Sequence, residues 1–413
     1  AMVKPVLLLV EDAHWIDPST LRIIERIIST CSDIPLMVLI THRTDWSHGW
    51  SGFTSDLSTL HLTRLDRESV AELIAQIAGR DLDSAFIDEV LTRTDGVPLY
   101  VEEVARFLLD AKVGRASEVP STLQGAMMAR LDAVPDFAKK VALAASVFGR
   151  EFDRALVAHA MDAQADRVAQ GIEELRRAGL VYESGQKRGV YIFRHALIRD
   201  TAYQSMISPT RRHYHAAAAG ALLSLRAAEI EREPELAANH LIEAQDYVAA
   251  FDYLKPAAEK ALARSASEEA VYHAERLVAV AENLGEGAME QQTVARIMLG
   301  RSFESIGRLP EALDLLGRTA ETARELGWHA HFVEAVYRFT DAALMSSGEI
   351  ERAHRLCKEA FDLVPEDDEP LRCLMLSQLA RCGMHAGDFE NSARHSREAV
   401  ALAEKLNDIR AQF

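Results

Sequence analysis

Two adjacent carboxylates follow the first apolar segment of the chain, and their position suits metal and water chemistry. Residues Val6–Val10 form a continuous apolar run of strand length, and Glu11 and Asp12 come directly after it. Such a run is typical of a strand buried on both faces of a parallel sheet. Ligands bind at the carboxyl ends of the strands in these sheets, so the pair can hold a magnesium ion and polarise a water molecule. The alternative is that the two acids merely begin a loop.

An α/β pattern surrounds this acidic pair. Asp17 followed by Pro18 predicts the start of a helix, because aspartate caps helices and proline suits the first helical position. A second apolar run, residues 36–40, predicts another buried strand, and residues 60–62 predict a third, short one. The order strand, helix, strand, loop and strand indicates an α/β domain.

A helical segment follows. Asp66 is suited to cap a helix that runs to about residue 77, and a second helix is expected over residues 84–94. Gly96 and Pro98 then predict a tight turn that leads into a further helix. Taken alone, this turn fits an ordinary corner between two helices.

The motifs resemble those of a known class of signalling ATPases. Residues 7–21, LLLVEDAHWIDPSTL, resemble the Walker B segment of STAND ATPases, in particular the ATPase regions of bacterial adenylate-cyclase-type and large LuxR-type regulators. The resemblance implies that Glu11 is the magnesium-associated acid and Asp12 the water-activating acid, although the family more often has aspartate at the first position. It also implies that Arg43 is the sensor arginine that follows the next core strand.

The turn at residues 96–103 extends this resemblance. GVPLYVEE is similar to the G-x-P motif of the same class, in which the proline packs against the adenine, so Gly96 and Pro98 become candidates for nucleotide binding. The implied cofactors are ATP or ADP with magnesium. No G-x-x-x-x-G-K-[ST] loop occurs in the chain, and that loop holds the phosphates. We therefore expect a fragment, cut at both ends, that binds no cofactor and is inactive alone; a naturally degenerate ATPase is the alternative.

The middle of the chain predicts helices followed by a hairpin. Four helices are expected between residues 123 and 178, and strands at residues 180–183 and 190–193. This order favours a winged helix. The segment FRHALIRDTAY resembles the part of STAND proteins in which a histidine faces the nucleotide phosphates, so His195 is the implied sensor of the ADP-bound state. Ala196 stands where the related M-H-D motif has aspartate.

The last two hundred residues repeat. Similar turn segments begin at Gly307, Gly348 and Gly387, with spacings of 41 and 39 residues, and a degenerate copy begins at Ser265. The pattern resembles tetratricopeptide repeats in a long form near 40 residues. Stacked helix pairs form a concave surface, on which we expect a protein partner or a small effector to bind. The closely spaced histidines at 213 and 215, or 329 and 331, face different sides of a helix and do not predict a metal site.

Charge and composition restrict the partners. The 413 residues carry a net charge of −17, divided as −8 over residues 1–118, +2 over 119–209 and −11 over 210–413. This acidity argues against broad nucleic-acid binding. The four cysteines form no C-x-x-C pair, and neither a membrane-spanning run nor a signal peptide is evident, so we expect reduced thiols and a cytoplasmic location.

These observations predict a mainly α chain of four parts: the C-terminal part of a P-loop NTPase α/β domain (1–64), a helical lid (65–118), a winged helix (119–209) and a tetratricopeptide-like solenoid (210–413). We interpret it as the regulatory module of a STAND-type ATPase, in which effector binding favours an ATP-bound state able to oligomerise. The resemblance places a nucleotide cyclase or a DNA-binding output domain elsewhere in the full-length protein. The alternatives are an interaction scaffold with a degenerate ATPase half, and a transcription regulator that contacts DNA.

Overall fold

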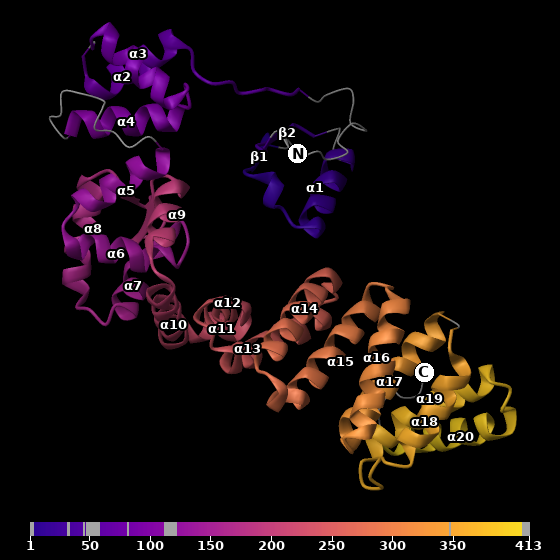
Figure 1. Ribbon diagram of the computed structural model, residues 1–413. Helices are drawn as coiled ribbons and strands as arrows, with labels where there is room; N and C mark the ends of the chain where they lie inside the picture. The colour runs from indigo at the N-terminus through magenta and orange to yellow at the C-terminus, as the bar shows by residue number, and fades with distance from the viewer. Residues whose placement is uncertain are drawn as a thin grey trace.

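The computed structural model describes residues 4–30, 34–43, 46, 58–80, 82–110, 122–346 and 348–406. Helices dominate it, with two small sheets in the N-terminal half, so the mainly α class predicted from the sequence is confirmed (Figure 1). In the part of the chain described, no helix is both long and apolar enough to cross a membrane.

The N-terminal sheet has two parallel strands, β1 (Val6–Val10) and β2 (Leu36–Ile40), paired in register from Val6 opposite Leu36 to Val10 opposite Ile40. A short 3-10 turn, η1 (Ala13–Trp15), and helix α1 (Pro18–Thr30) connect them. Asp17 caps α1 as predicted, because its Oδ1 accepts a hydrogen bond from the Thr20 backbone N–H at 2.8 Å.

Two predictions for this region are wrong. The strands are not buried on both faces: Leu7 is 63% exposed and Met37 is 62% exposed, because the described chain places no second layer over that face. Residues 60–62 form no strand, and Leu60 and Leu62 are 84% and 89% exposed. An apolar run too short to find a pairing partner gains nothing from an extended conformation alone.

Three helices follow around one apolar cluster. They are α2 (Arg67–Ala78), α3 (Ser84–Thr94) and α4 (Pro98–Asp110), and their shared core includes Val70, Ile74, Val90 and Val104. Asp66 caps α2 by accepting a hydrogen bond from the Ser69 N–H at 2.9 Å, as its position predicts.

The middle region combines helices with a three-stranded antiparallel sheet in the order β3-β5-β4. The hairpin strands β4 (Val181–Glu183) and β5 (Val190–Phe193) match the sequence prediction, whereas β3 (Glu151–Asp153) was missed because three residues carry no periodicity. The helices of this region are α5 (Leu123–Ala133), α6 (Asp136–Ser146), α7 (Arg154–Ala160), α8 (Ala165–Arg177) and α9 (Ala196–Ser205).

From α10 onward the chain is helical throughout, and successive helices stack into a tetratricopeptide-like array (Figure 1). The first helices of successive pairs, α13, α15, α17 and α19, pack beside one another as well as against their partners. They therefore line the inner side of the superhelix. The elements are α10 (Ser208–Leu225), α11 (Ala227–Arg232), α12 (Glu235–Ala244), α13 (Tyr247–Ala263), α14 (Ser267–Asn283), η4 (Glu286–Ala288), α15 (Met289–Ser305), α16 (Leu309–Glu325), α17 (His329–Ser346), α18 (Ile350–Phe361), α19 (Glu369–His385) and α20 (Phe389–Leu406).

Several turns of this array share a left-handed backbone conformation, although the residues in that conformation differ in type. Gly307 and Gly387 adopt φ of 77° and 82°, and Gln245 and Ser265 adopt φ of 64° and 57° at the corresponding helix ends. A left-handed residue ends a helix and reverses the chain. The units near Gln245 and Ser265 are therefore degenerate in sequence but regular in structure.

Candidate functional site

The acidic pair lies at the carboxyl end of β1, as predicted. Asp12 adopts a left-handed conformation with φ of 53°, and its backbone N–H donates to Thr41 Oγ1 at 3.0 Å. The neighbouring Ala13 N–H donates to the Thr41 carbonyl oxygen at 2.8 Å, so the residue after β2 holds the turn after β1. Glu11 and Asp12 are exposed, and their hard oxygen ligands suit magnesium.

The other predicted site residues lie elsewhere. Arg43 is exposed three residues beyond the end of β2. Figure 1 shows the β1–β2 unit well separated from α4 and α9, which carry Pro98 and adjoin His195. In the described part of the chain, the predicted nucleotide-binding residues are therefore not gathered around one site, and their roles remain predictions.

Gly96 and Pro98 form a tight corner with a clear structural reason for each residue. Gly96 adopts φ of 67°, and a Cβ at this position would clash with the Leu65 carbonyl oxygen. The Gly96 carbonyl oxygen accepts a hydrogen bond from the Leu65 N–H at 2.8 Å, which ties the corner to the residue before the Asp66 cap. Pro98 is the first residue of α4. The corner thus sets the direction of α4, whatever else it binds.

His195 faces the carboxylates of α4. It is the residue before α9, and its Nε2 lies 3.9 Å from Glu102 Oε2 and 3.8 Å from Glu103 Oε1. Burial lowers the pKa of His195 below its ordinary value, and this effect outweighs the opposing attraction of the two glutamates. The structure therefore brings the α4 corner and His195 together, through acidic residues that the sequence did not single out.

A buried ion pair fixes this contact. Glu103 is 0% exposed and Arg130 is 7% exposed, and Arg130 Nη1 donates to Glu103 Oε2. Arg130 Nη2 also donates to the Ala178 carbonyl oxygen at 2.5 Å, just beyond the end of α8. One guanidinium thus links α4, α5 and α8, and a buried charge of this kind is tolerated only when it is fully paired.

A second polar group lies on the inner helices of the repeat array, and sequence reasoning missed it. Gln378 Nε2 donates to Asp341 Oδ1 at 2.7 Å, and Arg381 Nη1 donates to the same oxygen at 3.1 Å. In the sequence, each of three successive inner helices carries a polar pair three residues apart. We call these six residues the inner strip: Arg301 and Glu304, Arg338 and Asp341, Gln378 and Arg381.

The inner strip is only partly satisfied. Glu304 Oε2 and Arg338 Nε are both buried and have no hydrogen-bond partner. Burial, with repulsion from Asp341, raises the pKa of Glu304 to about 7, and burial lowers the pKa of Arg301. Unpaired buried polar atoms are costly, so this strip is a candidate surface for a ligand that supplies the missing partners.

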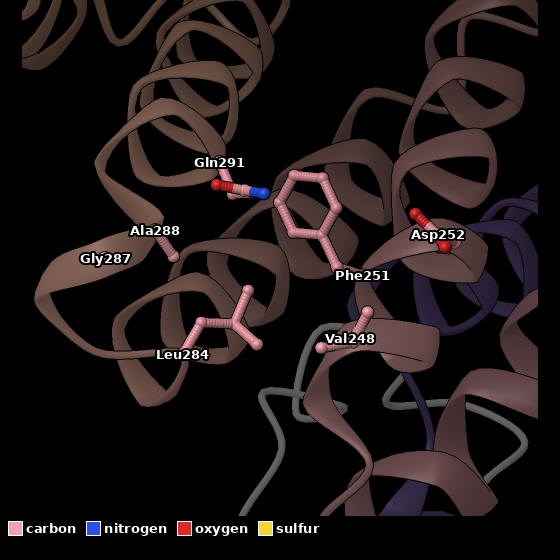
Figure 2. Close-up of a pocket in the computed structure, with 7 residues that line it drawn as sticks. All are labelled: Val248, Phe251, Asp252, Leu284, Gly287, Ala288 and Gln291. Carbon is pink, nitrogen blue, oxygen red and sulfur yellow. The ribbon is translucent and has the colours of Figure 1, made fainter.

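Two small hollows do not suit a nucleotide. Figure 2 shows the first, in which Phe251 of α13 faces the connection between α14 and α15. Each hollow has a volume of about 240 Å³, which is below the range of about 300–1,000 Å³ for small-molecule sites. The first is lined by Val248, Phe251, Asp252, Leu284, Gly287, Ala288 and Gln291, and the second by Pro135, Phe137, Ala138, Arg167, Gln170, Gly171 and Glu174.

Four basic residues of the middle region could contact DNA, namely Arg176, Arg177, Lys187 and Arg188, and the first three lie close to acids. On α8, Arg176 pairs with Glu173 at 2.8 Å and Arg177 with Glu174 at 2.9 Å. In the hairpin turn, Lys187 lies 3.7 Å from a carboxylate oxygen of Glu151. These acids offset the positive charge of the region, whose net charge over residues 119–209 is only +2, and DNA binding depends on such charge.

Three of the cysteines and His215 lie in buried positions. The side chains of Cys357, Cys373 and Cys382 are buried, and burial raises the pKa of Cys382 to about 11; Cys31 lies outside the described residues. His215 contacts His240, with 3.0 Å between their Nδ1 atoms, and burial lowers the pKa of both imidazoles to about 4.

Comparison with known sequences adds a partial relative. No protein-family model matches the chain. An uncharacterized protein of Rhizobium meliloti (strain 1021) is 24% identical over 225 residues, which are 51% of this chain and 22% of that protein. The match therefore spans about a fifth of the length of the relative.

Three solved structures match this chain at low identity and with TM-scores below 0.5. A STAND protein with a tetratricopeptide repeat sensor from Pyrococcus horikoshii is 11% identical, with a TM-score of 0.44, covering 98% of this chain and 63% of that one. Aspartyl phosphate phosphatase F of Bacillus subtilis is 10% identical, with a TM-score of 0.38, covering 85% of this chain and 78% of that one. Tetratricopeptide-like repeats of a putative kinesin light chain from Podosopora anserina are 15% identical, with a TM-score of 0.35, covering 49% and 99%.

The buried ion pair makes a direct prediction about stability. Glu103→Gln removes the charge that balances Arg130, and we expect it to lower the free energy of unfolding by about 3–5 kcal/mol. Glu102→Gln is the matched control, because Glu102 pairs with Arg106 at 3.0 Å in a partly exposed position worth about 1 kcal/mol or less. Chemical denaturation of both variants checks this, and equal losses would contradict it.

Glu304 makes a prediction about pH. Its folded pKa of about 7 lies above the ordinary value of 4.5, so the folded state binds this proton more tightly than the unfolded state does. The resulting stability is complete below pH 4.5 and is lost as the pH rises through 7.

The neutral variant Glu304→Gln isolates this effect. We expect it to have a higher melting temperature than the wild type at pH 8, by about 2–4 °C for each kcal/mol recovered, and to lose the advantage at pH 5. Glu325→Gln, at an exposed position on α16, is the control. A difference between Glu304→Gln and wild type that does not change with pH would contradict the assignment.

Proposed function

We propose that this chain is the receptor part of a signalling protein, and that the repeat array binds a protein partner along its inner strip. The observation that carries this proposal is the pair of unsatisfied buried atoms, Glu304 Oε2 and Arg338 Nε, on neighbouring inner helices. A peptide segment supplies both donors and acceptors through its backbone, so it can satisfy both groups once these half-buried side chains turn toward it.

The geometry of the array supports a peptide rather than a compact small molecule. The strip crosses α15, α17 and α19, which pack side by side, and its members form a line of donors and acceptors rather than a closed cavity. Extended concave surfaces of stacked helix pairs are suited to elongated ligands. The partly exposed Arg381 at the α19 end leaves the strip open to a segment that continues beyond it.

We further propose that a nucleotide controls this receptor in the full-length protein. Glu11 and Asp12 would hold magnesium, which supplies charge neutralisation for the nucleotide phosphates; Arg43, Gly96, Pro98 and His195 would contact the ATP or ADP. Support comes from the position of the acids at the carboxyl end of β1 and from the exposed apolar face of the β1–β2 sheet. That face needs a covering layer, as in a larger doubly wound sheet.

An interaction scaffold with a degenerate ATPase half is the second candidate. It is favoured by the separation of the β1–β2 unit from α4 in the described residues (Figure 1). A transcription regulator that contacts DNA is less well supported, because the arginines of α8 are paired with glutamates.

Selection from a phage-displayed library of random peptides tests the receptor. The wild-type chain should enrich specific peptides, and Arg338→Ala should weaken their binding by at least about tenfold, because it removes a buried charged hydrogen-bonding group. Arg318→Ala is the matched control, since Arg318 is an exposed arginine of α16 that pairs with Asp314. Equal affinity in Arg338→Ala and wild type would place the binding surface elsewhere.

Hydrolysis by the full-length protein tests the nucleotide switch. Asp12→Asn should abolish ATP turnover while nucleotide stays bound, because asparagine tolerates the left-handed backbone and removes only the charge. Asp17→Asn removes a nearby charge and keeps a good helix cap, so it should retain turnover. Failure of the wild-type full-length protein to bind ATP would favour the scaffold.

A further inference from the structure

The contact between His195 and helix α4 has the composition of a metal site. Among the residues that the structure describes, Glu102, Glu103 and His195 are the one group of three possible ligands whose donor atoms all lie within 4.8 Å of one another. The group comes from two elements far apart in sequence, because Glu102 and Glu103 lie on α4 and His195 precedes α9.

The ligand atoms that face one another are the ones left without partners. Glu103 is completely buried, and its Oε1 has no hydrogen-bond partner although its Oε2 is bound by Arg130. His195 Nε2 is likewise buried and unpartnered. A fully buried carboxylate oxygen without a donor is costly, and here it points toward an imidazole nitrogen that also lacks a partner.

The arginines orient the carboxylates without occupying them. Arg106 donates to Glu102 Oε1 at 3.0 Å, and Glu102 Oε2 is the oxygen that lies 3.9 Å from His195. Arg130 likewise donates to Glu103 Oε2, and the other oxygen, Glu103 Oε1, faces His195. Hydrogen bonds to the outer atom of a ligand are the usual means by which proteins orient metal-binding side chains.

We propose that Glu102, Glu103 and His195 bind a zinc ion that joins helix α4 to the start of α9. In a tetrahedral zinc site, ligand atoms lie about 3.4 Å apart. The two distances from His195 therefore need to close by about 0.5 Å, and the separation of the two glutamate oxygens, which is at most 4.8 Å, by up to about 1.4 Å. Glu102 and His195 are partly exposed, so a water molecule can supply the fourth ligand. Glutamate oxygens and a histidine nitrogen form a ligand set that zinc accepts.

The charge balance selects the kind of ion. Arg106 and Arg130 offset the two carboxylates and Arg194 adds a positive charge near His195, so the site carries no net negative charge when His195 is neutral. Magnesium and calcium depend on negatively charged oxygen ligands, whereas zinc also gains from the imidazole. We therefore expect zinc to bind and magnesium not to displace it. This inference does not depend on nucleotide binding at Glu11 and Asp12, but it replaces the nucleotide contact proposed above for His195, because one imidazole nitrogen cannot bind zinc and a phosphate at the same time.

Zinc titration of the chelator-treated chain, with metal content and circular dichroism measured, tests the site. Wild type should bind one zinc ion, and His195→Ala and Glu102→Gln should each weaken binding by at least about tenfold to a hundredfold, the range seen when even an outer partner of a metal ligand is removed. Cobalt in place of zinc should give a visible absorption band that His195→Ala abolishes. Glu102→Gln, at the partly exposed side of the site, keeps the test valid if His195→Ala fails to fold.

Two controls separate this site from other histidines. His240→Gln disrupts the His215–His240 contact, and His385→Ala removes an exposed histidine at the end of α19; both should retain zinc. The proposal is overturned if wild type binds no zinc, if His195→Ala and Glu102→Gln bind it as tightly as wild type, or if His240→Gln loses it.

Discussion

The buried ion pair of Glu103 and Arg130 is the constraint on which the contact between α4 and the middle region depends. Neither charge can reach water, so each must stay with its partner. Arg130 also binds the carbonyl of Ala178, and this brings the end of α8 to the same point. The position of α4 relative to the middle region is therefore set by this ion pair together with the apolar packing of Ala126 and Leu99. His195 lies against α4 as a consequence, since it follows the strand β5 that packs in the same core.

The repeat array is stabilised by close packing between its helices. It leaves buried polar atoms of the inner strip without hydrogen-bond partners. Its helices pack through small residues such as Ala312, Ala353 and Gly300, and the added Cβ of an alanine at Gly300 would lie 2.5 Å from Leu316 Cγ. Close packing of this kind needs no polar group inside the superhelix. The inner strip is therefore an additional cost that helix packing does not explain, and polar groups kept at such a cost are typical of binding surfaces.

The β1–β2 unit leaves apolar side chains uncovered, whereas the repeat array leaves polar atoms without hydrogen-bond partners. Its exposed face is apolar, with Leu7, Leu9, Met37 and Leu39 each well exposed, whereas its carboxyl edge carries the acidic pair. An apolar sheet face is stable only under a second layer, and the acids can act only on a ligand held by other groups. Among the described residues, the polar contacts of α4 and the inner strip are therefore the candidate sites whose side chains already lie together.

The sequence alone determined the elements whose signals are local. Aspartates at positions 17 and 66 cap helices, Gly96 and Pro98 form a corner, and a period near 40 residues specifies stacked helix pairs, because capping, left-handed turns and helical periodicity act over a few neighbours. It failed where an outcome depends on distant partners, as for the exposed faces of β1 and β2, the absent strand at residues 60–62 and the three-residue β3. Only the tertiary structure decided that Arg130 would select Glu103, that His195 would face α4, and that polar pairs of three repeats would meet in one strip. The contacts of Arg130 and His195 join residues tens of positions apart and leave no periodic trace in the chain, whereas the polar pairs of the inner strip recur with the repeat but do not by themselves show that they meet.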